Sequence, residues 1–354
     1  MLERHDPIEI PIPVLTRLLP SARPYSDPEA IRSAAEAFWS APGSRRLLPD
    51  PAAFEAYRAQ RAFEFTVWSY PALTPARLPL VVALNEFGYA FDSVFDDADL
   101  SAHSTTSTGE GQAADQGLSR YLDVFTDLAH RAQAVLSPPQ YERLMAAVAI
   151  TVNCLVNHHH SDLAQRSSRD IYHEHLNSGW IWVAQIVLEL AIDVDLSAYF
   201  SHDSLLKQYY HAACSTGVLV NQIFSLRKEY YCEGGVPTVI PALARERGIS
   251  FAEATTAVGE WTLREEQRCY DLRARVLTSP MGEDPSVRAF ITAVEFFLAG
   301  NLQWSRLTPR YHGTGFEYAG TTHGTMVFHP DRTIYVPAGS SSVGAAPNRR
   351  SRRA

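Results

Sequence analysis

Residues 218–235 read VLVNQIFSLRKEYYCEGG, an apolar helical pattern interrupted by a few polar side chains. Asn221, Ser225 and Glu229 recur at every fourth residue. Because a helix turns about 100° per residue, all three share one face. Their amide, hydroxyl and carboxylate oxygens make an incomplete shell that leaves room for water and phosphate oxygens, as magnesium prefers. Lys228 could donate to the same phosphate, but taken alone such a triple more often serves capping or helix–helix hydrogen bonding.

An acidic segment follows another apolar one: residues 78–91 read LPLVVALNEFGYAF, and residues 91–100 read FDSVFDDADL. In a helix, Asp92, Asp96 and Asp99 fall on one face, where they could present several oxygens to a divalent cation. The alternative is a solvated helix end, although the macrodipole disfavours acidic side chains near a helix C-terminus. Together, the two polar sets favour a site for divalent metal ions.

Helical periodicity dominates the chain. Apolar residues recur at three- and four-residue spacing in the segments 52–70, 78–97, 119–136, 139–160, 171–192, 205–231, 251–277 and 285–304. Strand signals are nearly absent before residues 326–336. We therefore expect an all-α fold. Prolines punctuate residues 1–50, which predicts a wrapping segment made of a strand-like lead and short helices.

The composition restricts the partners of the chain. Its 354 residues are 46% hydrophobic, which is typical of a soluble protein with a sizeable core. The net charge of -8 lacks the basic field that nucleic-acid binding needs, so we expect no nucleic-acid partner. The widely spaced cysteines suggest neither a disulfide framework nor a zinc site and fit a reducing, cytoplasmic location. The apolar stretch 181–192 contains Gln185 and Glu189 and is shorter than the roughly 20 residues that span a bilayer, so it predicts a buried helix and no stable membrane insertion.

Three landmarks occur in a specific order: the aspartate-rich segment, Asn221-x-x-x-Ser225-x-x-Lys228-Glu229, and Arg310-Tyr311 at the end of GNLQWSRLTPRY. In this combination, over residues 10–311, the chain resembles a bacterial class I terpene synthase. The resemblance implies a single α-helical bundle around a deep apolar pocket. It further implies that the mouth of the pocket holds three magnesium ions and the substrate diphosphate, and it leaves a homodimer open.

The reaction implied by this resemblance is magnesium-dependent ionisation of an acyclic allylic isoprenyl diphosphate, either farnesyl or geranylgeranyl diphosphate. Cyclisation of the carbocation would then give a terpene hydrocarbon or alcohol, with release of diphosphate. Metal ions would neutralise the charge that develops on the leaving oxygens. Arg310 and Tyr311 would clamp the diphosphate through charge-assisted and hydroxyl hydrogen bonds.

The resemblance assigns roles to individual residues. The expected catalytic residues are Asp96, Asn221, Ser225, Glu229, Arg310 and Tyr311. The expected metal ligands are Asp92, Asp96, Asp97, Asp99, Asn221, Ser225 and Glu229. The expected substrate-binding residues are Lys228, Arg310, Tyr311, His175, Arg169, Phe91 and Trp304. Phe91 and Trp304 are included because aromatic faces stabilise cations without offering a nucleophile, although such side chains more often belong to the core.

The chain departs from the family pattern in two places. Where the family usually carries an arginine that senses the diphosphate, this chain has IYHEHLNSG, with His175 as the nearest match and Arg169 close by. The aspartate motif also has two registers. Asp96-Asp97-Ala98-Asp99 is a shortened form, and Asp92-Ser93-Val94-Phe95-Asp96 is a form with serine in second place. We favour the first register because adjacent acids at a helix end need less burial of charge.

The expected domain covers residues 1–335. Within it, residues 101–117 are polar and contain glycines, which predicts a mobile loop. Residues 336–354 are small and polar and then basic, which predicts a disordered tail.

Three other functions stay open. Chain-elongating and head-to-head prenyltransferases use the same fold and ions, but both carry a second acidic motif where this chain has Asn221, Ser225 and Glu229. A helical interaction scaffold with a decayed ion site is the alternative that is not an enzyme.

Overall fold

A computed structural model describes residues 6–95, 111–158, 166–200, 204–232 and 238–339. Its helices are α1 (Pro28–Ser40), α2 (Pro42–Arg45), α3 (Pro51–Ala59), α4 (Phe63–Ser69), α5 (Leu78–Phe95), α7 (Gly111–Gln133), α8 (Pro138–His158), α9 (Ser168–Ser178), α10 (Ile181–Ala191), α11 (Leu205–Phe224), α12 (Val239–Arg247), α13 (Phe251–Thr278), α14 (Pro285–Leu307) and α15 (Pro309–His312). A π-helical segment, η3 (Lys228–Cys232), follows α11. The fold is all-α, as the periodicity predicts.

Several helices begin where side chains can bond the first free backbone N–H groups. Asp27 caps α1, whose first residue is proline, and Asp284 caps α14 in the same way. Ser250 and Glu253 form a reciprocal capping box at the start of α13. Such caps are worth about 1 kcal/mol each, and proline at the first helical position removes an N–H that would lack a partner.

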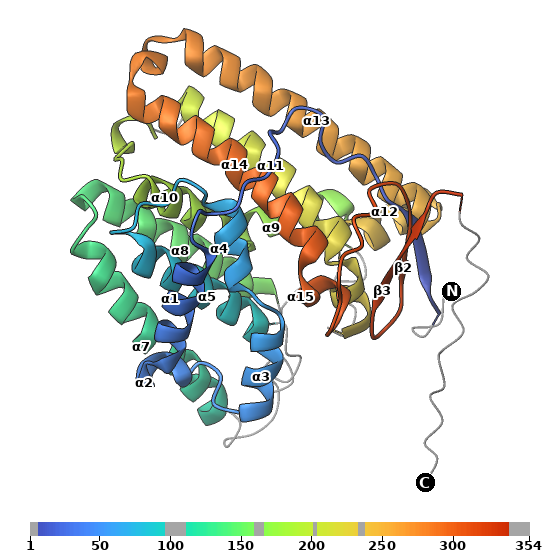
Figure 1. The fold of residues 1–354 in the computed structure, drawn as a ribbon, viewed down its shortest axis with the longest axis horizontal. Coiled ribbons are helices and arrows are strands. Elements are labelled where there is room, and N and C mark those ends of the chain that lie inside the picture. The colour runs from blue at the N-terminus through green and yellow to red at the C-terminus, as the bar shows by residue number, and fades with distance from the viewer. Residues whose placement is uncertain (1–5, 96–110, 159–165, 201–203, 233–237, 340–354) are drawn as a thin grey trace.

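The helices form one bundle. α11 packs against both α13 and α14, and these three helices run side by side in Figure 1. α5 packs against α1, α7 and α10, while α14 also packs against α4. The last contact is very close, since a Cβ added at Gly300 would lie 2.2 Å from the backbone oxygen of Trp68. Within the described residues, no helix is long and apolar enough to cross a membrane.

A small antiparallel sheet ties the start of the chain to its C-terminal part. β1 (Ile8–Pro11) pairs with β2 (Gly324–Phe328), which pairs with β3 (Thr333–Pro337). Ile10 lies opposite Met326, and both side chains are buried. The strand signal at 326–336 is therefore confirmed, and the expected tail from 336 onward begins inside β3.

Two expected long helices are broken. The segment 52–70 divides into α3 and α4 near Arg61, and the segment 171–192 divides into α9 and α10 at Trp180. Both residues have positive φ, 56° and 60°, in the left-handed region that side chains rarely adopt. Apolar periodicity continues across each break because both halves face the same core, so the pattern does not reveal it.

Other boundaries also differ from expectation. α7 begins at Gly111, so the last part of the expected loop 101–117 is helical, and residues 101–110 lie outside the described residues. Alanine and glutamine in this stretch are strong helix formers, which offsets its glycines. α12 was not among the expected helices, and its Pro241 lies in the first helical turn, where proline is tolerated.

Candidate active site

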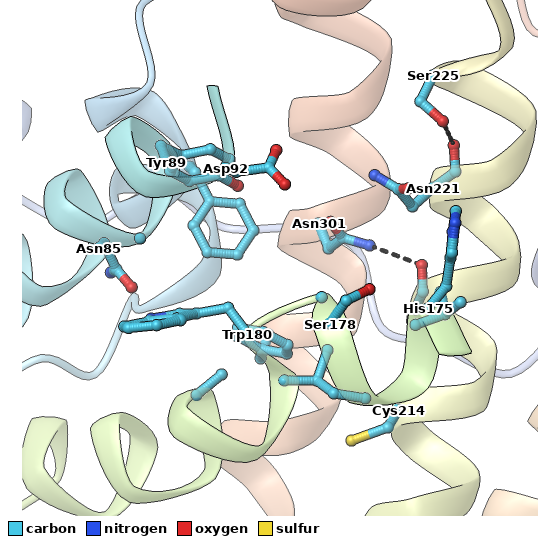
Figure 2. A pocket seen from close by; sticks show the side chains of 18 of the residues that line it. Asn85, Tyr89, Asp92, His175, Ser178, Trp180, Cys214, Asn221, Ser225 and Asn301 are labelled. Carbon is cyan, nitrogen blue, oxygen red and sulfur yellow. Dashed lines mark hydrogen bonds between the residues drawn. The ribbon is translucent and has the colours of Figure 1, made fainter. Parts of the chain in front are cut away.

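A cavity of about 300 Å³ lies in the middle of the bundle. Its walls come from α4, α5, α8, the α9–α10 break, α11 and α14, and α15 adds two residues. Apolar and aromatic side chains line much of it, namely Phe65, Tyr89, Phe91, Trp180, Val218, Phe297 and Leu298. Figure 2 shows Asp92, Asn221 and Ser225 at one end of this space, with Trp180 and Cys214 toward the other.

The three oxygen donors of the 218–235 segment all line the cavity. Ser225 ends α11, and its hydroxyl donates to the backbone oxygen of Asn221 at 2.7 Å. Glu229 lies one turn further, where its backbone N–H bonds the oxygen of Ser225 at 3.0 Å. The regular spacing therefore persists into the π-helical segment. The side chain of Glu229 is buried, with 8% exposed.

Asp92 faces these donors from α5 and lines the same cavity. Its side chain is half exposed, and its Oδ2 accepts a hydrogen bond from Nη2 of Arg310 at 2.6 Å. The other three expected acidic ligands, Asp96, Asp97 and Asp99, lie outside the described residues. Only the N-terminal end of the aspartate-rich segment is therefore placed.

Arg310 and Tyr311 connect Asp92 with the expected oxygen ligands of the 218–235 segment. The guanidinium of Arg310 lies 5.7 Å from the centroid of the Tyr89 ring and also bonds the side chain of Gln60. The amide nitrogen of Asn221 donates to the hydroxyl of Tyr311 at 2.7 Å. Burial raises the pKa of Tyr311 well above its usual range, with Arg310 opposing the shift. The hydroxyl therefore stays protonated at neutral pH.

The short helix α15 is held in place by buried contacts. Nε of Arg227 donates to the backbone oxygen of Tyr311 at 2.7 Å, and its Nη1 reaches the oxygen of Pro330 at 2.7 Å. Thr308 caps the helix and donates to the backbone oxygen of Gln60. Burial lowers the pKa of His312 to about 3, so its ring is neutral. The sequence pattern points to neither Arg227 nor Gln60, although Arg227 lies between Ser225 and Lys228 in the 218–235 segment.

Comparison with known proteins agrees with this geometry. The family profile described as terpene synthase family 2, C-terminal metal binding, matches residues 84–268, which is more than half of the chain. The chain belongs to this terpene synthase family. A (3S,6E)-nerolidol synthase of Selaginella moellendorffii is 23% identical over 241 residues, which is 66% of this chain and 65% of that relative. The chain therefore spans slightly less than two thirds of that relative's length.

Solved structures of terpene synthases share the fold. The germacradien-4-ol synthase of Streptomyces citricolor has a TM-score of 0.66 and 16% identity, covering 82% of this chain and 97% of its own. The linalool/nerolidol synthase of Streptomyces clavuligerus has a TM-score of 0.66 and 17% identity, covering 82% of this chain and 100% of its own. At such identities the likeness establishes the helical architecture alone.

Only some of the other expected substrate-binding residues of this terpene synthase line the cavity. His175, Lys228 and Phe91 line the cavity. Arg169 does not, because it lies on the outer side of α9 in a separate surface groove. Trp304 does not either, because it is completely buried and its ring packs between its aromatic neighbours rather than facing the cavity.

The break between α9 and α10 adds a further wall to the cavity. The indole of Trp180 lines the cavity and packs on α5 at Gly88, where an added Cβ would lie 2.9 Å from Nε1. Ser178 and Gly179 line the cavity beside it. Glycine at 88, four residues before Asp92, is the only hint of this close approach in the sequence.

The donor set fits a hard divalent cation. The nitrogen end of the Asn221 amide is used by Tyr311, which leaves its oxygen as the possible ligand. The hydroxyl of Ser225 donates its hydrogen to a backbone oxygen, so the lone pairs on Oγ can face a cation. With the carboxylate of Glu229, these are the oxygen types that magnesium takes, and the family is metal-binding.

Proposed function

We propose that this protein is a class I terpene synthase that ionises an acyclic allylic isoprenyl diphosphate and cyclises the resulting carbocation. One observation carries the proposal. Asp92 lies with Asn221 and Ser225 at one end of the cavity. Arg310 bonds Asp92, Tyr311 bonds Asn221, and Glu229 lines the same cavity, whose remaining walls are largely apolar and aromatic. A diphosphate needs the polar end, and an isoprenyl chain needs the apolar walls.

The polar end is suited to hold the diphosphate. We expect Asn221, Ser225 and Glu229 to hold magnesium, with Asp92 and the neighbouring aspartates, three ions in all. Magnesium would supply neutralisation of the charge on the leaving oxygens. Arg310 and Lys228 would add charge-assisted hydrogen bonds, and the protonated hydroxyl of Tyr311 is a further donor.

The apolar walls are suited to protect a carbocation. Phe91, Phe65 and Trp180 present aromatic rings to the cavity, and ring faces attract a cation without reacting with it. Burial raises the pKa of Tyr89 well above its usual range, so this wall residue is a neutral phenol rather than a nucleophilic phenolate. Packed walls also exclude water, which would otherwise quench the cation.

The size of the cavity favours farnesyl over geranylgeranyl diphosphate. Its volume of about 300 Å³ lies at the lower end of the roughly 300 to 1,000 Å³ that is typical of ligand pockets. We therefore expect the fifteen-carbon substrate to be turned over faster than the twenty-carbon one.

The test is incubation of purified protein with geranyl, farnesyl and geranylgeranyl diphosphate, each with and without magnesium. Gas chromatography of the extract and an assay for inorganic diphosphate are run in parallel. We expect a hydrocarbon or alcohol from farnesyl diphosphate, with matching diphosphate release, only when magnesium is present. Folded protein that yields neither product nor diphosphate would favour the interaction scaffold. A longer prenyl diphosphate formed in the presence of isopentenyl diphosphate would favour the chain-elongating alternative.

A further inference from the structure

Gln222 is a completely buried polar residue that follows Asn221 on α11 and does not line the cavity. Both ends of its side-chain amide are used. Oε1 accepts a hydrogen bond from the backbone N–H of Val239, at the start of α12, at 2.9 Å. Nε2 contacts Nδ1 of His175, in the last turn of α9. Gln222 therefore links three helices at the edge of the site.

These contacts determine which nitrogen of His175 carries hydrogen. A backbone N–H can only donate, so the oxygen end of the Gln222 amide must face Val239. The NH₂ end then faces the ring, and because NH₂ can only donate, Nδ1 of His175 must accept. A flipped amide would set two buried donors against each other at Val239.

We infer that Gln222 is a positioning residue that holds His175 as an Nε2–H donor toward the substrate diphosphate. The inference rests on the proposed function and on the expectation that His175 takes the place of the diphosphate-sensing arginine of the family. An arginine donates from every nitrogen of its head group, whereas a neutral imidazole has one N–H that can sit on either side of the ring. A histidine in this role needs a partner that selects the nitrogen, and Gln222 supplies it.

The first test reads the tautomer directly. Protein labelled with ¹⁵N-histidine is examined by long-range ¹H–¹⁵N correlation, and the signals of His175 are assigned by their loss in His175→Phe. We expect Nδ1 without hydrogen and Nε2 with hydrogen. In Gln222→Glu the carboxylate can only accept, so Nδ1 should become protonated. A wild-type signal with hydrogen on Nδ1 would overturn the inference.

The second test measures the consequence for binding. Gln222→Met keeps the length of the side chain and removes both hydrogen bonds, so the Michaelis constant for the diphosphate substrate should rise about tenfold while kcat changes less than about twofold. The matched control is Gln185→Met, a buried glutamine on α10 that does not line the cavity, and it should leave both constants unchanged. Equal behaviour of the two variants at equal stability would contradict the inference.

A third measurement separates this inference from the proposed function. Calorimetric titration with inorganic diphosphate and magnesium needs no turnover. If no isoprenyl diphosphate is converted, but Gln222→Met still weakens diphosphate binding about tenfold and the tautomer is as stated, the proposed function fails and the positioning role stands. If turnover is normal and diphosphate binding is the same in Gln222→Met and Gln185→Met, the positioning role fails alone.

Discussion

Arg310 contacts several of the side chains at the polar end of the cavity. It is 5% exposed, and it bonds Asp92 from α5 and Gln60 from the segment between α3 and α4 while facing the ring of Tyr89. A buried cation of this kind is stable only with such partners. The planar guanidinium can donate hydrogen bonds to several groups at once, and a diphosphate would be a further acceptor.

Replacing Arg310 by lysine keeps the charge and removes the planar fork. We expect kcat/KM for the diphosphate substrate to fall about a hundredfold, because one ammonium cannot serve Asp92, Gln60 and a phosphate together. Steady-state kinetics on folded protein measures this. Arg306→Lys, in the last turn of α14 and outside the cavity, is the control and should be near wild type. Activity of Arg310→Lys within twofold of wild type would contradict a role of Arg310 in binding the diphosphate.

Glu229→Gln removes the carboxylate from the donor set but keeps its shape. We expect turnover to fall at least about a hundredfold, and half-maximal activity to need about ten times more magnesium, since a neutral amide neutralises less of the cation's charge. The melting temperature without metal should shift by no more than about 2 °C, because a buried charge is lost together with its interactions. Glu260→Gln, on an exposed part of α13, is the control. A large loss of metal-free stability with activity intact would assign Glu229 to packing.

At the scale of elements, the site depends on how closely helices approach α5. Glycine at 88 admits the indole of Trp180, and the break before α10 turns that indole toward α5. On the opposite side, Glu86 of α5 accepts hydrogen bonds from Trp39 of α1 at 2.7 Å and Tyr57 of α3 at 2.9 Å. α5 therefore contributes a cavity wall with one face and a buried polar junction with another.

Gly88→Ala should disturb the wall built by Trp180. The new Cβ would lie 2.9 Å from Nε1, so the indole or α5 must shift, at a cost of about 1 to 3 kcal/mol in unfolding free energy. Because the indole also lines the cavity, the product distribution should change as well. Urea unfolding and gas chromatography measure the two effects. Gly43→Ala in α2, where nothing lies within 4 Å of the new Cβ, should have neither.

Glu86 should make stability depend on pH. Burial raises its pKa above the ordinary value, and the hydrogen bonds from Trp39 and Tyr57 only partly oppose this. The folded protein thus retains a proton that the unfolded chain releases, so this contribution to stability is complete below the unfolded pKa of about 4.3 and is lost as the pH rises through the folded pKa.

Glu86→Gln keeps an acceptor for both donors and does not titrate. We therefore expect the free energy of unfolding of Glu86→Gln, relative to wild type, to improve as the pH is raised from about 4 to 7. Urea unfolding at several pH values measures the difference. A difference that is constant over this range would show that the pKa of Glu86 is the same in the folded and the unfolded protein.

At the scale of the whole molecule, the N-terminal segment lies against the helix α13. After β1, the chain runs along α13, where the carboxylate of Glu266 accepts the backbone N–H groups of residues 17, 18 and 19 at distances between 2.9 and 3.2 Å. Thr16 also donates to this carboxylate through its hydroxyl. One buried acid therefore holds the segment that also completes the sheet with β2.

Glu266→Ala should release this wrapping segment. Loss of several hydrogen bonds to one charged group is expected to cost about 2 to 4 kcal/mol in unfolding free energy. Trypsin should then cleave at Arg17 or Arg23 under conditions in which the wild type resists. The neighbouring Glu265→Ala removes an ion pair with the exposed Arg268 and should cost less than about 1 kcal/mol. Equal protease resistance in both variants would contradict the wrapping role of Glu266.

Features that depend on neighbours along the chain can be predicted from the sequence. The helical class follows from three- and four-residue periodicity, and the shared face of Asn221, Ser225 and Glu229 follows from their spacing on one helix. Both are local properties, since a few turns of backbone are enough to define them. The strand signal at 326–336 is local in the same way.

Which distant groups meet depends on how the helices pack. Arg310 and Asp92 lie 218 residues apart, and Gln222 and His175 come from different helices. The burial of Trp304 away from the cavity and the break at Trp180 likewise depend on which face each helix turns to its neighbours. Periodicity identifies an apolar face but not its partner, because partners are selected by close packing of the whole bundle, and that selection leaves no local pattern in the chain.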